Sequence, residues 1–325
     1  MTKAIVVHET GGPEVLKWED VEVGEPGPGQ ARIRHTAVGL NYIDTYFRSG
    51  LYKAPNGLPF IPGNEGAGVV EAVGEGVTEL KVGDRIAYPG ALGAYSQERI
   101  VDAARVVKVP DAIDDKSAAG MMLKGMTARY LLRRTYPVTA GTTILFHAAA
   151  GGVGLIAGQW AKHLGATIIG TAGSEDKVEL AKAHGYTHVI NYRTENFVER
   201  VKEITGGKGV DVAYDSVGRD TYPGTLDCIH PLGLWVPFGQ SSGPIKDFDL
   251  QILNQKGSLF CTRPTLFHYI AERADLEETA RDLFDVVASG AVSIRVNQEY
   301  PLAEAGRAHT DLEGRKTTGT TVLIP

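Results

Sequence analysis

Residues 145–154 read LFHAAAGGVG, an apolar run followed by a cluster of small residues. The run predicts a buried strand, and the small residues predict a tight turn that opens a helix. Three of them match the G-x-G-x-x-G dinucleotide fingerprint, with alanine in place of the first glycine. Glycine lets the backbone approach a pyrophosphate and lets the helix pack closely on the strand. The residues expected at the phosphates are Ala149, Gly151, Gly152, Val153 and Gly154.

The chain downstream of this turn alternates between strands and helices, which favours a nucleotide site over a plain small-residue turn. Continuous apolar strands separated by amphipathic helices predict a parallel sheet covered on both faces. The expected strands are 142–147, 167–171, 189–191, 210–215, 233–238 and 258–261. The expected helices are 153–164, 175–184 and 195–205, with a helical stretch near 220–229.

The first third of the chain has a different pattern, with short apolar or alternating runs between turn residues. These runs, at 4–7, 31–37, 68–73 and 84–88, predict a barrel or sandwich. One or two helices are expected within 114–134. The tail, with a helix at 276–289 and strands at 296–301 and 320–324, returns to the first pattern. We therefore expect an α/β protein with two domains, residues 1–125 with 266–325 and residues 126–265.

Composition limits which binding partners and which cellular compartment can be expected. The chain has 33 basic and 39 acidic residues, a net charge of −6 without a basic stripe, so nucleic acid is an unlikely main partner. Two cysteines exclude a disulfide framework and a four-cysteine zinc site. No signal-peptide pattern and no apolar run of about 18 residues is present, so a cytoplasmic location and no membrane span are expected.

The second strand of the sheet bears on the choice of nucleotide. NAD-specific sites place an acid about 20 residues after the glycines, but this strand ends at Gly173 and Ser174. The absent acid leaves room for a 2′-phosphate, which Ser174, Lys177 and Tyr192 can bind. Ser174 as a helix cap and Lys177 as a solvated residue are the alternatives. We expect NADPH.

Together these motifs resemble the quinone oxidoreductase (zeta-crystallin-like) family of zinc-independent medium-chain dehydrogenases/reductases. The resemblance spans nearly the whole chain and implies a Rossmann doubly wound parallel sheet plus a GroES-like β-barrel domain. It also implies an active site in the cleft between the domains, and a homodimer as the expected assembly. It is carried by 39–44, Tyr46, 50–52, 62–68, 83–86, 124–128, 145–154, 191–192, 214–218, 233–240 and 315–319.

The zinc-containing branch of this superfamily differs from the chain at two positions. That branch has Gly-His-Glu where this chain has Gly63-Asn64-Glu65, and a ligand cysteine where this chain has Asn41. Asparagine is a poor zinc ligand compared with imidazole or thiolate. We therefore expect no metal, in agreement with the cysteine count.

The resemblance also implies the residues around the nicotinamide and the acceptor. The expected catalytic residues are Asn41, Tyr46, Tyr52, Asn64 and Thr127. Asn41 and Thr127 would orient the carboxamide or substrate oxygens, and either tyrosine would stack on a planar acceptor or donate a proton; a packing role is the alternative. Further expected cofactor contacts are Ser216, Phe238, Gly239, Ser241, Phe260 and Arg315. Placement at strand ends supports the first three independently, whereas Arg315 rests on the resemblance alone.

Without a metal, a small quinone is the preferred acceptor, because its conjugated carbonyls already accept reducing equivalents. The expected function is NADPH-dependent quinone reduction. An enal or enone double-bond reductase is the nearest alternative. An RNA-binding or crystallin-like structural role is the alternative of another class.

Overall fold

The computed structural model describes residues 1–90 and 92–325, and the chain divides into two compact units. The first unit contains Met1–Met126, Ile270–Ala288 and Ile294–Pro325. The second contains Thr127–Tyr269 and Ser289–Ser293. Residues 266–269 and 289–293, which the sequence pattern assigned to the first domain, group with the second.

The second unit is built on a six-stranded parallel sheet with the order β10-β9-β8-β11-β12-β13. Its chain runs outward from β8 to β10 and then crosses back to β11, so β8 and β11 flank a topological switch point. Ligands of open α/β sheets bind at such points, beyond the carboxyl ends of the strands. The strands are β8 (Thr143–Phe146), β9 (Thr167–Ala172), β10 (His188–Asn191), β11 (Val210–Asp215), β12 (Ile229–Pro237) and β13 (Phe260–Cys261).

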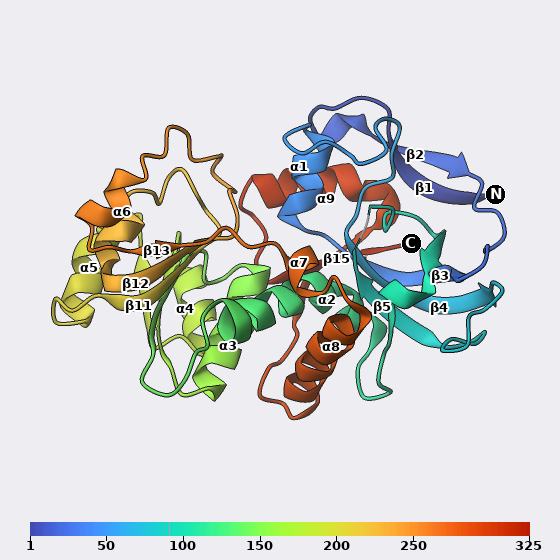
Figure 1. Cartoon of the computed structure of the whole chain (residues 1–325). Helices are drawn as coiled ribbons and strands as arrows, with labels where there is room; N and C mark the ends of the chain where they lie inside the picture. Colours follow the sequence, from blue (N-terminus) through green and yellow to red (C-terminus); the bar gives the residue numbers. More distant parts are fainter. Residues whose placement is uncertain (91) are drawn as a thin grey trace. The chain divides into compact units, whose positions relative to one another are not determined.

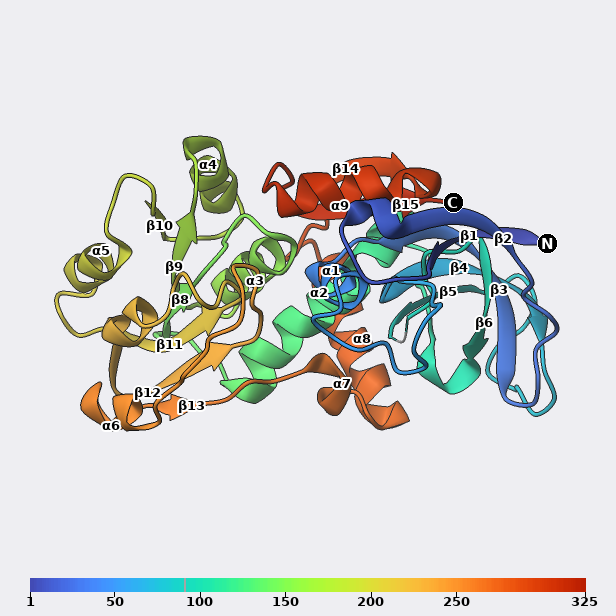
Figure 2. The same ribbon diagram turned by 90° about the horizontal axis from the view of Figure 1, so that it is seen from above.

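Helices cover both faces of this sheet, as the continuous apolar strands predict. Figure 2 shows α3 and α5 on opposite sides of β8 and β9. A 3-10 turn, Gly224–Cys228, replaces the helix predicted near 220–229. Leu145, Ile169 and Trp235 belong to the buried core between the sheet and α5. The helices are α3 (Gly152–His163), α4 (Glu175–Ala183), α5 (Phe197–Ile204), α6 (Gln251–Gln255) and α7 (Leu266–Tyr269).

The first unit is a mainly antiparallel β structure. Its seven-stranded sheet has the order β14-β15-β3-β4-β5-β7, with β6 pairing to β3, and β1 pairs with β2 in a separate hairpin (Figure 1). Bulges in the pairing of β3 with β4 let the sheet curve. The strands are β1 (Thr2–Val7), β2 (Leu16–Val21), β3 (Gln30–Gly39), β4 (Glu65–Val73), β5 (Arg85–Pro89), β6 (Glu98–Asp102), β7 (Val107–Lys108), β14 (Val296–Pro301) and β15 (Thr320–Ile324).

Four helices accompany this sheet, and two of them were not predicted. Helix α1 (Tyr42–Arg48) and helix α9 (Ala305–Glu313) are short and lie in stretches where no helix was expected. Helix α8 (Arg273–Ala288) and helix α2 (Asp115–Tyr130) match expected helices, and α2 ends in a π-helical turn, Leu131–Thr135. Short 3-10 turns cover Pro13–Val15, Ala103–Arg105 and Leu302–Glu304.

Candidate active site

The glycine turn lies where β8 ends and α3 begins, at the switch point of the sheet. Ala148 adopts a left-handed backbone conformation, with φ of 57°, and Gly151 is the N-cap residue of α3. No described side chain caps this helix, and its first bond from position i to i−4 is Leu155 N to Gly151 O, at 2.9 Å. Gly151 N donates to Ala148 O at 2.9 Å, whereas the N–H groups of Gly152, Val153 and Gly154 precede the first i to i−4 bond and face an anion site at a positively polarised helix end.

Close packing explains the small residues of the turn. A Cβ on Gly154 would lie 2.5 Å from the Ala149 carbonyl oxygen, so a side chain cannot be placed there without displacing the strand. A Cβ on Gly170 of β9 would lie 2.7 Å from the Cβ of Ala149. Glycine on the neighbouring strand thus makes the space that lets alanine occupy the first position of the fingerprint.

The tip of β9 brings Gly173, Ser174 and Tyr192 together. A Cβ on Gly173 would collide with the Tyr192 hydroxyl, and Tyr192 N donates to Ala172 O at 3.1 Å. Ser174 is the N-cap residue of α4, but its hydroxyl makes no capping hydrogen bond to the described residues. The neighbouring carboxylate, Glu175, accepts a hydrogen bond from the Asn191 amide at 2.5 Å. The Tyr192 hydroxyl therefore lies beside Gly173, the residue before Ser174, and Lys177 lies on the first turn of α4.

Four expected residues, Ser216, Phe238, Gly239 and Ser241, lie at the ends of β11 and β12. Ser241 N donates to Ser216 O at 3.1 Å, and a Cβ on Gly239 would lie 2.7 Å from the same oxygen. Arg263 Nη1 donates to Gly239 O at 3.3 Å and fixes this loop. The Phe238 ring packs on Phe146 with 5.8 Å between centroids.

The remaining expected residues are not brought into these clusters. Phe260 lies on the edge strand β13 and is 62% exposed. Thr127 is a buried residue of α2 at the start of the second unit. Arg315 belongs to the first unit, just after α9, with a left-handed φ of 58°.

In the first unit, a buried carboxylate holds Asn41, one of the expected site residues. Glu65 is fully buried and forms an ion pair with Lys124, which is also buried. Its Oε1 accepts from Asn41 Nδ2 at 2.8 Å, and its Oε2 accepts from Leu123 N at 2.7 Å. Asn64 is held separately, since its Nδ2 donates to Gly90 O at 2.8 Å. Asn41 is thus fixed by Glu65, whose role and whose pairing with Lys124 were not predicted.

The expected tyrosines are paired at the end of α1. Tyr46 and Tyr52 have ring centroids 5.3 Å apart in an edge-to-face arrangement, and Tyr52 N donates to Tyr46 O at 2.9 Å. Phe47 packs against Tyr52 with 5.8 Å between centroids. This aromatic group offers apolar ring surface from one short helix and the loop after it.

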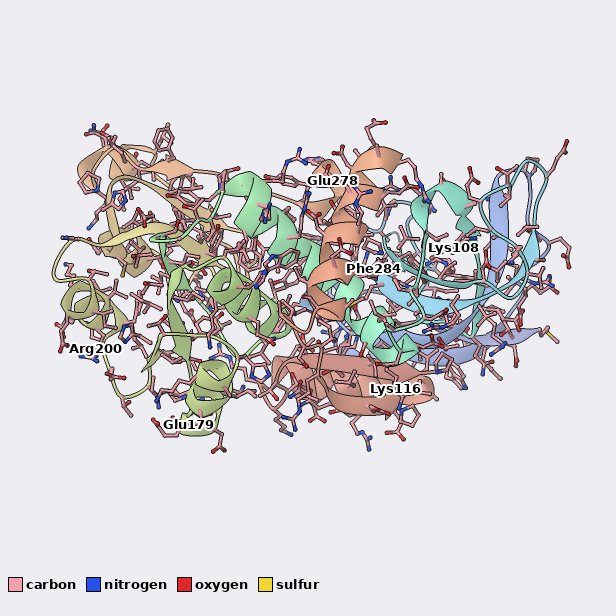
Figure 3. All side chains as sticks on the ribbon, turned by 90° about the horizontal axis from the view of Figure 1, so that it is seen from below. Lys108, Lys116, Glu179, Arg200, Glu278 and Phe284 are labelled. Carbon is pink, nitrogen blue, oxygen red and sulfur yellow. The ribbon has the colours of Figure 1, made fainter. Side chains whose placement is uncertain are left out.

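A separate pocket in the first unit, of about 430 Å³, contains none of the expected site residues. It lies against α8, and Figure 3 labels two of its lining residues, Lys108 and Phe284. Its lining includes acidic and basic side chains in equal number, so its charge does not favour one class of ligand; they are Glu79, Glu277, Asp285, Lys108, Arg273 and Arg281.

The described residues offer neither a metal cluster nor a membrane-spanning helix. Within residues 1–90 and 92–325, no group of three or more His, Cys, Asp or Glu side chains is arranged to hold a metal ion. None of the helices in the described part of the chain combines the length and apolar character needed to cross a bilayer.

Comparison with known proteins identifies the family. Residues 27–111 match the alcohol dehydrogenase GroES-like domain, and residues 152–286 match the zinc-binding dehydrogenase domain. A quinone oxidoreductase from Pseudomonas aeruginosa is 54% identical over 326 residues, with 100% of both chains covered. The chain belongs to the quinone oxidoreductase family. The predicted α/β fold, a Rossmann sheet with a GroES-like domain, is confirmed.

Other members of the family differ in their acceptors. The crystal structure of the Escherichia coli quinone oxidoreductase complexed with NADPH is similar, with a TM-score of 0.98, 50% identity and coverage of 99% of this chain and 100% of that one. A 2-haloacrylate reductase from a Burkholderia species is 49% identical over 337 residues, covering 100% of this chain and 99% of the relative.

The buried ion pair yields a stability prediction. Lys124→Met leaves the carboxylate of Glu65 buried without a cation, and we expect the free energy of unfolding to fall by about 3–5 kcal/mol. Urea unfolding at pH 7 measures this change. Lys116→Met is the matched control on the same helix, because the pair of Lys116 with Glu299 is solvent-exposed and should contribute only ~0–1 kcal/mol. Equal losses in both variants would contradict the importance of burial.

Proposed function

We propose that this protein is a zinc-independent, NADPH-dependent quinone reductase that acts in the cytoplasm. The observation that carries the proposal is the start of α3, where a glycine N-cap and uncapped N–H groups form an anion site at the switch point of the sheet. The relatives named quinone oxidoreductases, at 50–54% identity over their whole length, support the choice of acceptor.

The residues of the second unit fit the dinucleotide. The first turn of α3, from Gly151 to Gly154, would hold the pyrophosphate, since a side chain on Gly151 would fill the space beside the Ala148 carbonyl. Ser174, Lys177 and Tyr192 would bind a 2′-phosphate. The carboxylate of Glu175 is already bound to an amide, which reduces its repulsion toward that phosphate. When bound, NADPH supplies the reducing equivalents.

The proposed acceptor-site residues act by binding and orienting the acceptor. Tyr46 and Tyr52 provide ring faces or edges for a planar quinone, and their hydroxyls are candidates to donate a proton to the reduced oxygen. Glu65 holds Nδ2 of Asn41, and the Asn41 side chain accepts from the Asp44 backbone N–H in the capping box of α1. The second lone pair of Oδ1 is proposed to accept from an amide or hydroxyl donor. Asn64 and Thr127 are proposed to complete the contacts. Ser216, Phe238, Gly239 and Ser241 are proposed cofactor neighbours, as are Phe260 and Arg315.

Reduction of an activated carbon–carbon double bond is the second candidate. It is favoured by one observation, the 49% identity with a 2-haloacrylate reductase. A double bond conjugated to a carboxylate or carbonyl accepts reducing equivalents from the same cofactor, so the fold alone does not distinguish the two acceptors.

The 2′-phosphate site is tested by Lys177→Ala. Loss of a charge-assisted hydrogen bond should weaken NADPH binding roughly tenfold and leave NADH binding nearly unchanged. Fluorescence titration with each nucleotide measures both constants. Lys182→Ala is the control on the same helix, because Lys182 pairs with Glu179 on the exposed face. Equal weakening for NADPH and NADH would refute the assignment.

The acceptor is tested by following NADPH oxidation with 1,4-benzoquinone, a polycyclic ortho-quinone, an enal and 2-chloroacrylate. We expect turnover with at least one quinone at a higher kcat/KM than with the enal or the haloacrylate. Turnover of the double-bond substrates alone would replace the quinone proposal with the second candidate.

We further propose a homodimer, supported by the aromatic side chain of Phe260 exposed on the edge strand β13. Sedimentation equilibrium should give about twice the chain mass of 34.8 kDa. Phe260→Asp should lower that mass. Val82→Asp, at an equally exposed apolar residue of the first unit, should not. A monomeric wild-type protein would contradict the proposal.

A further inference from the structure

Four side chains of the first unit form a buried hydrogen-bonded chain that the proposed function does not use. Arg48 Nη1 bonds to His309 Nδ1 at 3.1 Å, His309 Nε2 bonds to the Tyr95 hydroxyl at 3.0 Å, and this hydroxyl bonds to Asp44 Oδ2 at 3.0 Å. Arg48 is itself held by Glu313, with bonds of 2.8 and 2.9 Å. The side chains of the hydrogen-bonded chain, from Arg48 to Asp44, belong to residues that are at most 2% exposed.

The direction of each hydrogen bond in this chain follows from chemistry. A guanidinium can only donate, so Nδ1 of His309 accepts and its Nε2 carries the hydrogen. Nε2 therefore donates to the Tyr95 oxygen, and the Tyr95 hydrogen is directed to Asp44 Oδ2. Burial, aided by the charge of Arg48, lowers the pKa of His309 to about 3, so this ring is neutral in the physiological range. Burial also raises the pKa of Tyr95 well above its usual value, so the hydroxyl stays protonated.

This chain of hydrogen bonds holds two segments that carry proposed acceptor residues. The segments are the start of α1 and the loop before Asn64. Asp44 lies in the first turn of α1, and its Oδ2 accepts from the backbone N–H of Asn41 at 2.9 Å. Tyr95 N donates to Pro62 O at 2.9 Å, and the Tyr95 ring fills the space where a side chain on Gly63 would lie. Tyr95 is thus bonded to the start of α1 on one side and packed against the loop before Asn64 on the other.

We propose that Asp44, held by Tyr95 and His309, is a positioning residue that sets the geometry of the acceptor site according to its own charge. This inference rests on the proposed function, because it concerns the same site. Asp44 acts through Asn41 and α1 and does not itself contact the acceptor.

The surroundings of Asp44 make its charge variable near neutral pH. Its Oδ1 is buried and has no hydrogen-bond partner among the described residues. Burial raises the pKa of Asp44 to about 7, against the opposing effect of the bonds from Asn41 N and Tyr95. Glu65 raises this pKa further and Lys124 lowers it. The titratable or charged groups around it are Arg48 on α1, Glu65 on β4, Tyr95 after β5, Lys124 on α2, and His309 and Glu313 on α9.

The ionised form should be the productive one. A carboxylate accepts the Asn41 and Tyr95 hydrogen bonds more strongly than a neutral acid does, and its charge favours the N-terminus of α1. The start of α1, and with it Asn41 and Tyr46, should be best ordered when Asp44 is charged. The kcat/KM for the acceptor should then rise roughly tenfold from pH 6 to pH 8, the ratio that one group of pKa about 7 produces.

The test is the pH profile of three variants with whichever acceptor the wild-type protein reduces. Asp44→Asn, which resembles the neutral acid, should lose this ionisation from kcat/KM. Tyr95→Phe removes a donor to the carboxylate, so the ionisation should move to higher pH. Tyr88→Phe is the matched control, a buried tyrosine that bonds to His35 and not to Asp44, and its profile should keep the wild-type midpoint. A wild-type midpoint in Asp44→Asn, or a downward shift in Tyr95→Phe, would overturn the proposal.

A second measurement needs no acceptor. The folded pKa of Asp44 lies above the usual carboxyl value, so the folded state binds more protons than the unfolded state between about pH 4 and 7. Its contribution to stability therefore falls as pH rises through this range. Asp44→Asn lacks that fall, so its stability relative to wild type should increase with pH. A flat difference refutes the ionisation. Absence of turnover with every acceptor refutes the proposed function and the positioning role together, whatever the unfolding data show.

Discussion

The burial of Glu65 is the constraint on which the first unit depends. A fully buried carboxylate is costly unless hydrogen bonds and an opposite charge surround it. Glu65 obtains an ammonium from Lys124, an amide from Asn41 and a backbone N–H from Leu123. These partners come from α2 and from the start of α1, so satisfying one carboxylate fixes three segments together. Such a pair need not add net stability, but it penalises any arrangement in which a partner is lost.

In the second unit the corresponding constraint is steric. The carbonyl of Ala149 leaves no room for a side chain on Gly154, and the Cβ of Ala149 leaves none on Gly170. Tyr186 adds a hydrogen bond to the Gly154 carbonyl at 2.8 Å, with its ring against Gly158. Close packing, which excludes larger side chains, therefore fixes the conformation of the strand-to-helix turn. As a result, backbone N–H groups are exposed at the start of α3. One unit fixes charged groups by hydrogen bonds and ion pairs, and the other fixes a backbone turn by close packing.

The elements predictable from sequence are those with a strong local signal. The strands of the second unit and its helices α3, α4 and α5 were anticipated because apolar runs and small-residue turns alternate there, whereas the short helices α6 and α7 were not. Helices α1 and α9 were missed because each is short and lacks a long periodic face. The pairing of Glu65 with Lys124 spans 59 positions, and no local pattern reports it. Phe260 was expected beside the cofactor from resemblance, but its position on an exposed edge strand provides no independent support for that role.

Glu65 and Asp44 are two buried carboxyl groups near the same asparagine, and their surroundings differ in kind. Glu65 bonds directly to a cation, whereas among the described residues Asp44 receives only the neutral donors Asn41 N and Tyr95, and its Oδ1 has no partner there. The first carboxylate anchors the side chain of Asn41 by a hydrogen bond and is itself held by the ion pair with Lys124. The second meets the backbone of the same residue with a charge that depends on pH, so a structural carboxylate and a responsive one act on one site residue from two sides.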